Sequence, residues 1–229
     1  ARDDNYDVID AGPALIVGAG LAGLFAALKF ESVPVTVLSA APLGAGASSV
    51  WAQGGIAAAI GPDDSPALHV QDTLTAGAGI VDERIAEIIA GEARARINDL
   101  VRLGVPFDRD ADGHLALGRE AAHSRRRIVR VKGDQAGAAI MTALIDAVRA
   151  RKSISVLEPY IATDLIVIEG RAAGVWAQTR EGRRVAIRAG AVIFALGGSG
   201  GLYEITTNPP QARGFGLAMA ARAGALAAD

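Results

Sequence analysis

The segment Ala14–Leu28 has the sequence ALIVGAGLAGLFAAL, and it decides the fold of this chain. Its first four residues are apolar, which is typical of a short parallel strand buried on both faces. Gly18, Gly20 and Gly23 follow in a G-x-G-x-x-G pattern, and apolar residues at helical spacing come next. A second short strand is expected at Val35–Leu38. The segment therefore predicts a β-α-β unit with parallel strands.

The glycine spacing predicts a dinucleotide-binding turn. The first glycine permits the tight turn, the second lets the backbone approach a pyrophosphate, and the third lets helix and strand pack closely. The helix then offers its free N–H groups and positive dipole end to the phosphates. An apolar strand-turn-helix with incidental glycines is the alternative, and the second strand at the right distance disfavours it. The expected contacts also include the intervening residues Ala19, Leu21 and Ala22.

Composition excludes several classes of function. The 229 residues are enough for one large domain or for one domain and part of a second. The net charge of -2 gives no electrostatic reason to expect nucleic acid or an anionic membrane as a partner. Without cysteine, the chain has no thiolate metal site, disulfide or thiol nucleophile, no metal is expected, and cytoplasm is the default location. Ala14–Leu28 is shorter than the roughly 20 residues that span a bilayer.

The remaining periodicity predicts an α/β fold with a doubly wound parallel sheet and a small β-meander. Asp82 is the expected N-cap of a helix for which Gly104 is the C′ residue, and another helix is expected over residues 133–151. From 153 to 194 the pattern changes to period two, with turns at residues 169–170 and 181–182 and a buried strand at 191–195. The helix that Asp82 caps carries apolar residues at helical spacing, namely Ile85, Ile88, Ile89, Ile97 and Leu100.

Ser39 occupies the position where many dinucleotide-binding domains bind ribose. An Asp or Glu about 20 residues after the glycines usually takes the ribose hydroxyls. The Ser39 hydroxyl could make one such hydrogen bond, or Ser39 could simply end the second strand. The sequence leaves both interpretations open. The missing acid disfavours an NAD-dependent dehydrogenase.

The stretch 48–58, SSVWAQGGIAA, resembles the flavoprotein group that contains the L-aspartate oxidases and the flavoprotein subunits of succinate dehydrogenase and fumarate reductase. The resemblance implies that FAD is the cofactor and that its flavin is lined by this loop. A pair of glycines there suits a backbone lying against a flat ring. Respiratory members attach FAD covalently to a histidine at the position of Ser48, so the resemblance implies non-covalent FAD here. The expected flavin contacts are Ser48, Ser49, Gln53, Gly54 and Gly55.

The stretch 119–128, REAAHSRRRI, resembles the REGGHSRRRI segment of the L-aspartate oxidase family. The resemblance implies that Glu120 pairs with a substrate ammonium group, which succinate lacks. His123 is the second candidate catalytic residue. For Arg125–Arg127, a solvated basic turn with local acid partners is the alternative to a functional site, and the net charge disfavours a nucleic-acid patch.

Further motifs extend the resemblance from about residue 14 to residue 229. They include TTNP at 206–209 and GFGLAMA at 214–220. The resemblance implies FAD-dependent oxidation of L-aspartate to iminoaspartate, the first step of quinolinate and NAD synthesis. Fumarate or oxygen is the implied acceptor, and quinolinate synthase is a candidate partner. The expected cofactor contacts are completed by Ala162, Gly197 and Gly198.

Four departures from the family pattern, one of them a pair of neighbouring residues, fall near expected contacts. Ala40 replaces a lysine, Phe215 an aspartate, Leu196 a threonine, and residues 121–122 are Ala-Ala instead of Gly-Gly. Each lost polar contact is worth on the order of 1–3 kcal/mol if it is buried. The departures predict weaker FAD binding than is usual in the family.

The family continues beyond this length into a capping domain and a helical C-terminal domain. Residues 1–229 are therefore expected to form an incomplete FAD-binding domain that breaks in mid-fold at Asp229 and is inactive alone. It could be a fragment, an incomplete sequence or a degenerate paralogue. Two other functions remain open. One is a non-catalytic FAD-binding module, and the other is a succinate or fumarate oxidoreductase flavoprotein, which Ser48 and Glu120 disfavour.

Overall fold

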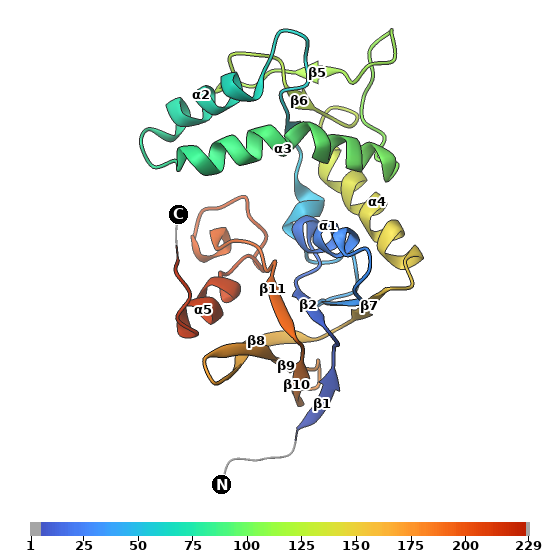
Figure 1. Cartoon of the computed structure of the whole chain (residues 1–229), viewed down its shortest axis with the longest axis vertical. Coiled ribbons are helices and arrows are strands. Elements are labelled where there is room, and N and C mark those ends of the chain that lie inside the picture. Colours follow the sequence, from blue (N-terminus) through green and yellow to red (C-terminus); the bar gives the residue numbers. More distant parts are fainter. Residues whose placement is uncertain (1–5, 228–229) are drawn as a thin grey trace. The chain divides into compact units, whose positions relative to one another are not determined.

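The computed structural model of the chain describes residues 6–227, so the expectation for Asp229 lies outside the described residues. The described residues divide into two compact units. Unit 1 comprises residues 6–49 and 144–227, and unit 2 comprises residues 50–143. Figure 1 shows the helices and strands of both units.

Unit 1 is built on a four-stranded parallel sheet with the order β11-β2-β3-β7. Helix α1 connects β2 to β3, which confirms the predicted β-α-β unit and the α/β class. The period-two segment that begins at residue 153 was expected to form the β-meander, but its first strand, β7, is instead the edge strand of this sheet. The elements are β2 (Ala14–Val17), α1 (Leu21–Lys29), β3 (Val35–Leu38), β7 (Ile154–Leu157) and β11 (Ala191–Phe194).

The two faces of the parallel sheet are covered by different layers. Successive residues of a strand point to opposite faces. Leu15 and Val17 belong to a buried cluster with Val175 and Ile187 of the second sheet. Ile16, which is fully buried, therefore faces the opposite side, where α1 contacts β2 and β3. One face of the sheet thus carries α1, and the other carries the second sheet.

The second sheet of unit 1 has the order β1-β10-β9-β8. Its hairpins turn where the sequence predicts, and Glu169 and Gly170 adopt positive φ angles of 50° and 76°. Strand β1 pairs in parallel with β10 and was not predicted from the sequence. The strands are β1 (Asp7–Asp10), β8 (Ile161–Ile168), β9 (Arg171–Gln178) and β10 (Arg184–Arg188). Unit 1 also contains η2 (Gly200–Leu202) and α5 (Phe215–Arg222).

Unit 2 combines the helices α2 and α3 and the first part of α4 with a small antiparallel sheet of order β4-β6-β5. None of these strands was predicted. Helix α4 (Ala136–Ala150) begins in unit 2 and continues into unit 1, close to the expected range. The 3₁₀ helix η1 (Ser48–Trp51) also spans the boundary. The other elements are β4 (Ile56–Ala57), α2 (Pro66–Gly77), α3 (Glu83–Arg102), β5 (Leu117–Gly118) and β6 (Ile128–Val129).

Helix α3 begins and ends at the predicted residues. The carboxylate of Asp82 accepts a hydrogen bond from the Ile85 N–H at 3.1 Å, and Gly104 follows the helix with a φ of 89°. Its large apolar residues are buried only in the second half, at Ile97 and Leu100, whereas in the first half the isoleucines are exposed and the buried residues are Ala86 and Ala90. Among residues 6–227, no helix has both the length and the apolar character needed to cross a membrane.

Replacing Gly23 by alanine should destabilise unit 1. A Cβ at Gly23 would lie 1.9 Å from the carbonyl oxygen of Gly18, a backbone atom that cannot move without disturbing β2. We expect Gly23→Ala to lower the free energy of unfolding by about 1–3 kcal/mol, the usual cost of overpacking. Gly91→Ala is the matched control, since a Cβ there meets no atom within 4 Å and alanine favours a helix.

Urea denaturation of both variants measures the difference. The close packing of helix and turn is contradicted if Gly23→Ala is as stable as Gly91→Ala.

Candidate functional site

The glycine turn of unit 1 has the geometry of a phosphate cradle. Gly18 adopts a φ of 114°, and a Cβ there would lie 2.2 Å from the carbonyl oxygen of Ala195, so only glycine fits. Gly20 is the N-cap of α1, and its position provides no side-chain cap. Ala22 and Gly23 lie in the first helical turn, where backbone N–H groups have no acceptor within the helix. The turn therefore fits the pyrophosphate of a dinucleotide.

Ser49 fixes the start of this helix. Its Oγ accepts a hydrogen bond of 3.0 Å from the Leu21 N–H. A Cβ at Gly20 would lie 3.3 Å from the same Oγ, so a larger side chain there would press on this contact. Because its Oγ already accepts a bond, the Ser49 hydroxyl keeps its own hydrogen for another acceptor.

Several predicted contacts lie at one edge of the parallel sheet. Gly18 follows β2, Ser39 follows β3, and Gly197 and Gly198 come three and four residues after Phe194, the last residue of β11. Parallel strands place their carboxyl ends at the same edge, which is where open α/β sheets bind ligands. Within unit 1, the structure thus brings together the residues that the sequence assigned to the dinucleotide at this edge.

Ser39 itself is buried, with 6% of its surface exposed, and its Oγ donates to the Ala41 carbonyl oxygen at 2.5 Å. The hydroxyl hydrogen is thus used within the turn, and the oxygen alone is left to accept. The structure therefore supplies a local reason for a serine at the end of β3, and ribose contact stays a prediction.

A pocket of about 290 Å³ lies beside this turn in unit 1. Its lining is mostly apolar and contains a single cationic side chain, that of Arg180. Ala162 follows the lining residue Ile161. Its side chain packs against the core between the two sheets, which indicates a structural role. The lining residues are Ala40, Ala41, Pro42, Pro159, Ile161 and Arg180.

Gly54 and Gly55 of unit 2 belong to the flavin loop, the segment 48–55 that is expected to line the flavin, and their surroundings differ. A Cβ at Gly55 would lie 2.1 Å from the carbonyl oxygen of Val129, so the pairing of β4 with β6 requires glycine there. Gly54 is exposed, and a Cβ there would lie 3.7 Å from Glu120 Oε1. Gln53 is also exposed. The structure therefore places the Glu120 carboxylate beside the flavin loop, within the same unit.

Glu120 has one charged neighbour among the described residues. Its Oε1 lies 3.6 Å from Nη2 of Arg130, and the two side chains are 50% and 36% exposed. His123 is in the same turn, because its N–H donates to the Glu120 carbonyl oxygen at 3.0 Å. Unit 2 thus holds Glu120 and His123 together with Gln53, Gly54 and Gly55, and unit 1 holds the other predicted contacts.

Arg127 is the centre of a buried ion network in unit 2. Its guanidinium bonds both carboxylate oxygens of Asp64 at 2.9 Å and reaches Asp72 at 2.8 Å. The side chains of Arg127 and Asp64 are 0% exposed. The interpretation of Arg125–Arg127 as a solvated turn is therefore wrong for Arg127. The same interpretation fits Arg125, whose Nε lies 4.0 Å from the exposed carboxylate of Asp63.

The same network fixes His123. Nη1 of Arg127 lies 3.4 Å from His123 Nδ1, and arginine can only donate, so Nδ1 accepts. In neutral His123 the hydrogen is then on Nε2, which makes that nitrogen a donor. The ring of His69 meets His123 edge to face at 5.6 Å.

The network also shifts two titrating groups. Burial, then the Arg127 charge and His123, lower the pKa of His69, whose Nδ1 has no hydrogen-bond partner among the described residues. Burial alone would raise the pKa of Asp72, but hydrogen bonds from Ser124 and the charge of Arg127 hold it below its ordinary value. His69, Asp64 and Asp72 were missed from the sequence because they lie dozens of residues from the 123–127 segment that they contact.

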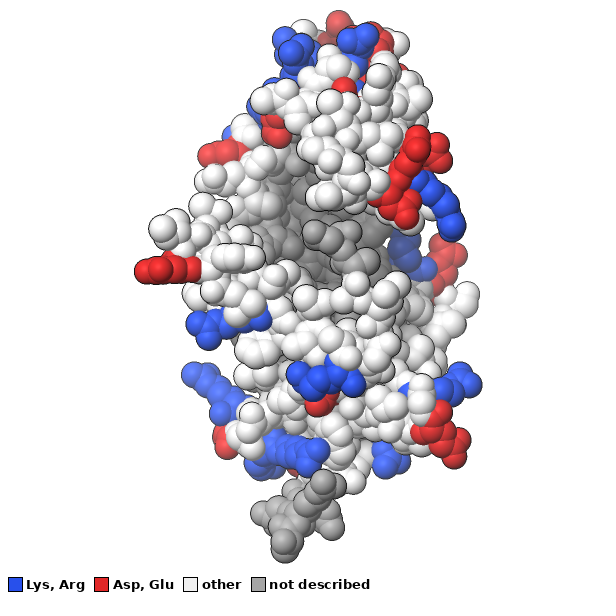
Figure 2. All heavy atoms as spheres, turned by 90° about the vertical axis from the view of Figure 1, so that its left-hand side faces the viewer, with Lys and Arg blue, Asp and Glu red and all other residues white. Residues whose placement is uncertain are grey.

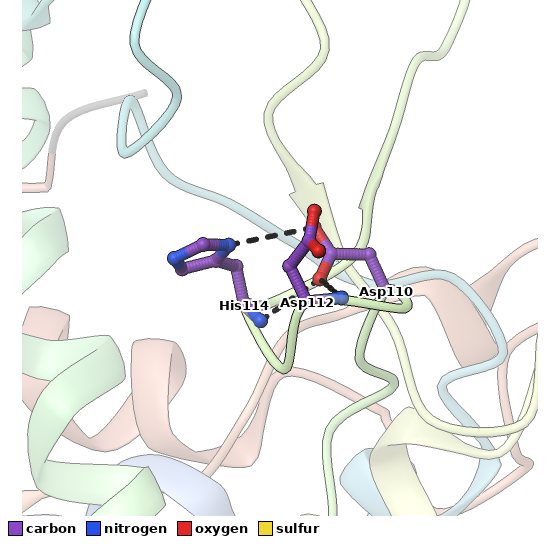
Figure 3. A group of neighbouring side chains, drawn as sticks. All are labelled: Asp110, Asp112 and His114. Atoms are coloured by element: carbon purple, nitrogen blue, oxygen red, sulfur yellow. Dashed lines mark hydrogen bonds and ion pairs between the residues drawn. The ribbon is translucent and has the colours of Figure 1, made fainter.

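Asp110, Asp112 and His114 gather at a surface turn (Figure 3). Asp110 Oδ1 already accepts the N–H groups of Asp112 and His114 at 3.0 and 2.9 Å, and its Oδ2 lies 3.8 Å from His114 Nδ1. These contacts explain the cluster as a turn stabilised by a side-chain carboxylate.

Figure 2 shows basic and acidic side chains interspersed on the face in view.

The parallel sheet and the glycine turn at its carboxyl edge define a dinucleotide-binding domain. Residues 14–229 match the family described as FAD binding domain. The chain belongs to this family, and FAD is its cofactor.

The chain is similar to the N-terminal part of L-aspartate oxidases. It is 51% identical to the enzyme of Caulobacter vibrioides, covering 98% of this chain and 44% of the relative. For the enzyme of Streptomyces coelicolor the identity is 43%, covering 96% of this chain and 39% of the relative. The chain thus spans less than half the length of these relatives.

Two solved structures share the fold. Mycobacterium smegmatis Sdh1, in a complex with UQ1, superposes with a TM-score of 0.87 at 31% identity, covering 94% of this chain and 39% of that chain. FrdA of the E. coli quinol fumarate reductase superposes with a TM-score of 0.85 at 27% identity, covering 93% and 37%. These similarities confirm the predicted flavoprotein fold.

Removing the charge of Asp64 should destabilise unit 2 strongly. Asp64→Asn would leave the buried Arg127 without its bidentate partner, and breaking a buried ion pair costs about 3–5 kcal/mol. Asp63→Asn is the matched control, because its side chain is 72% exposed and should change stability by no more than about 0.5 kcal/mol. Thermal unfolding of the two variants decides the matter, and equal midpoints would contradict the network.

Proposed function

We propose that this chain is the FAD-binding part of an L-aspartate oxidase, which oxidises L-aspartate to iminoaspartate. The observation that carries the proposal is the half-exposed carboxylate of Glu120 beside Gly54 of the flavin loop. It offers an anion for a substrate ammonium at a place where dicarboxylates without an amine would gain nothing. The identity of 51% to an L-aspartate oxidase supports the same conclusion.

The chain's own residues bind and orient the reactants. FAD, when bound, supplies the acceptor for the hydride that leaves the substrate Cα. Glu120 holds the ammonium group and so fixes which face of Cα is presented, a positioning effect that can lower a barrier substantially. His123, held through Nδ1 by Arg127, offers its Nε2–H as a hydrogen-bond donor.

The cofactor contacts that we propose fall into two groups. In unit 1, Gly18–Gly23 bind the pyrophosphate, and Ser39, Ala162, Gly197 and Gly198 lie toward the adenosine and the sheet edge. The proposed flavin contacts are Ser48 and Ser49 in unit 1 and, taken separately, Gln53, Gly54 and Gly55 in unit 2. Because Ser48 has no imidazole, FAD is held without a covalent bond. The family's lysine and aspartate are replaced by Ala40 and Phe215, and the loss of these two polar side chains weakens the affinity of the chain for FAD.

A succinate or fumarate oxidoreductase flavoprotein is the second candidate. The TM-scores of 0.87 and 0.85 with Sdh1 and FrdA favour it. The position of Glu120 favours an amino-acid substrate instead. Fumarate or oxygen as the acceptor, quinolinate synthase as a partner and a cytoplasmic location stay predictions of the sequence.

Gly20→Val should abolish FAD binding. A valine side chain would press on Ser49 Oγ, 3.3 Å from the Cβ position, and cover the turn that a phosphate must approach. Gly91→Val is the control for the added side chain, since its Cβ position is open. We expect the wild type and Gly91→Val to release FAD into the supernatant on acid precipitation, and Gly20→Val to contain none. A folded Gly20→Val protein with full FAD content would refute the turn assignment.

Glu120→Gln should weaken the binding of L-aspartate and leave the binding of succinate unchanged. Loss of a charged partner for an ammonium costs about 1.5–3 kcal/mol, or roughly tenfold to a hundredfold in the dissociation constant. Succinate has no ammonium and should bind the variant as it binds the wild type. Calorimetric titration of the FAD-loaded protein with each ligand measures both constants. Equal losses for the two ligands would count against an amine-binding role.

A further inference from the structure

Arg180 is the single charged side chain that lines the pocket beside the end of β3 in unit 1. The rest of the lining is aliphatic and is supplied by residues 40–42, Pro159 and Ile161. Arg180 is exposed, and within residues 6–227 it makes no hydrogen bond and has no carboxylate within 4.0 Å of its guanidinium. Its donors are therefore available to a ligand that enters this pocket.

The turn between β9 and β10 holds the backbone of Arg180 in place. The Thr179 N–H donates to the Arg183 carbonyl oxygen at 3.0 Å, and the Gly182 N–H donates to the Thr179 carbonyl oxygen at 3.0 Å. Hydrogen bonds from its own N–H and from Thr179 lower the pKa of Glu181, the carboxyl group next to Arg180. These bonds keep the Glu181 carboxylate within the turn, so it does not occupy the guanidinium.

The wall formed by residues 40–42 is also ordered before any ligand binds. The Leu43 N–H donates to Glu158 Oε2 at 2.8 Å, which ties the segment after β3 to the end of β7. The Ser39 Oγ donates to the Ala41 carbonyl oxygen at 2.5 Å, as described above. The pocket is therefore preformed, as ligand sites in proteins usually are.

The pocket lies where the base of a dinucleotide is expected. Strands β2, β3 and β7 are successive neighbours in the parallel sheet, and the pocket walls 40–42 and Pro159 follow β3 and β7. In dinucleotide-binding domains the pyrophosphate lies at the turn after the first strand, and the ribose lies near the end of the second. The base then comes next along the carboxyl edge. The volume of about 290 Å³ is small for a ligand pocket and suits one base better than a whole dinucleotide.

We infer that Arg180 binds the adenine of FAD, with its planar guanidinium against the face of the base. A guanidinium stacks on aromatic faces, and the aliphatic lining packs against the rest of the ring system. Ala40 lines the same pocket without a charge, so Arg180 restores part of the affinity that the missing lysine removes. The inference requires FAD as the cofactor and does not depend on which substrate the flavin oxidises.

The test is calorimetric titration of the FAD-free protein with FAD and with ADP, which has the adenosine and the pyrophosphate but no flavin. We expect Arg180→Gln to weaken both ligands by the same factor, about threefold to thirtyfold, which is the range of a cation–π contact. Arg180→Lys keeps the charge but not the plane and should retain only part of the affinity. Arg183→Gln is the matched control in the same turn, since Arg183 does not line the pocket, and it should bind both ligands as the wild type does.

A lysine at position 40 provides an independent check from the opposite wall. Because Ala40 and Arg180 line one pocket, Ala40→Lys should restore most of the FAD affinity in the Arg180→Gln background. In the wild-type background it should add less, since the pocket already contains a cation. The two substitutions should therefore be non-additive, as expected for side chains that serve the same ligand group.

Three outcomes would overturn the inference. The first is unchanged binding of FAD and ADP by Arg180→Gln. The second is weaker FAD but unchanged ADP, which would place Arg180 on the flavin half. The third is wild-type affinity of Arg180→Lys beside a weak Arg180→Gln, which would mean a charge acting on the phosphates. Equal thermal midpoints of Arg180→Gln and Arg183→Gln without ligand exclude a folding defect, and the Gly20→Val and Glu120→Gln experiments test the proposed function separately.

Discussion

The close approach of backbone to backbone at the glycine turn is the constraint on which unit 1 depends. Gly23 packs on the carbonyl of Gly18, and Gly18 packs on the carbonyl of Ala195, with no room for a Cβ at either position. These contacts bring α1, β2 and β11 together and leave the first N–H groups of the helix at the carboxyl edge of the sheet. The fold and the phosphate cradle are therefore produced by the same glycines.

Unit 2 depends on charge in a comparable way. Arg127 is fully buried, and Asp64 and Asp72 neutralise it from the loop before α2 and from α2 itself. The network anchors the segment 123–127 to α2, and this segment follows the turn that carries Glu120. A basic run that looks like a solvated surface is in part the internal support of the candidate substrate site.

The sequence predicted the β-α-β unit, both long helices and the hairpin turns because local periodicity and capping residues encode them. It did not predict β1 or the short strands β4, β5 and β6, which are two to four residues long and form through distant partners. Ile85 and Ile88 have helical spacing but are exposed, since periodicity predicts a helix and not what covers it. Gly55 was assigned to the flavin, yet its Cβ direction points at β6, a contact that only the fold reveals.

We propose that FAD bound to this domain accepts electrons from L-aspartate in the whole protein of which residues 1–229 form the FAD-binding part, by way of a site that recognises the amine. The most direct measurement is anaerobic mixing of the FAD-containing protein, purified from its own cells, with L-aspartate or with succinate, followed by the visible flavin absorption. We expect L-aspartate to bleach the flavin, whereas succinate at the same concentration should not. Bleaching by succinate but not by L-aspartate would contradict the proposal.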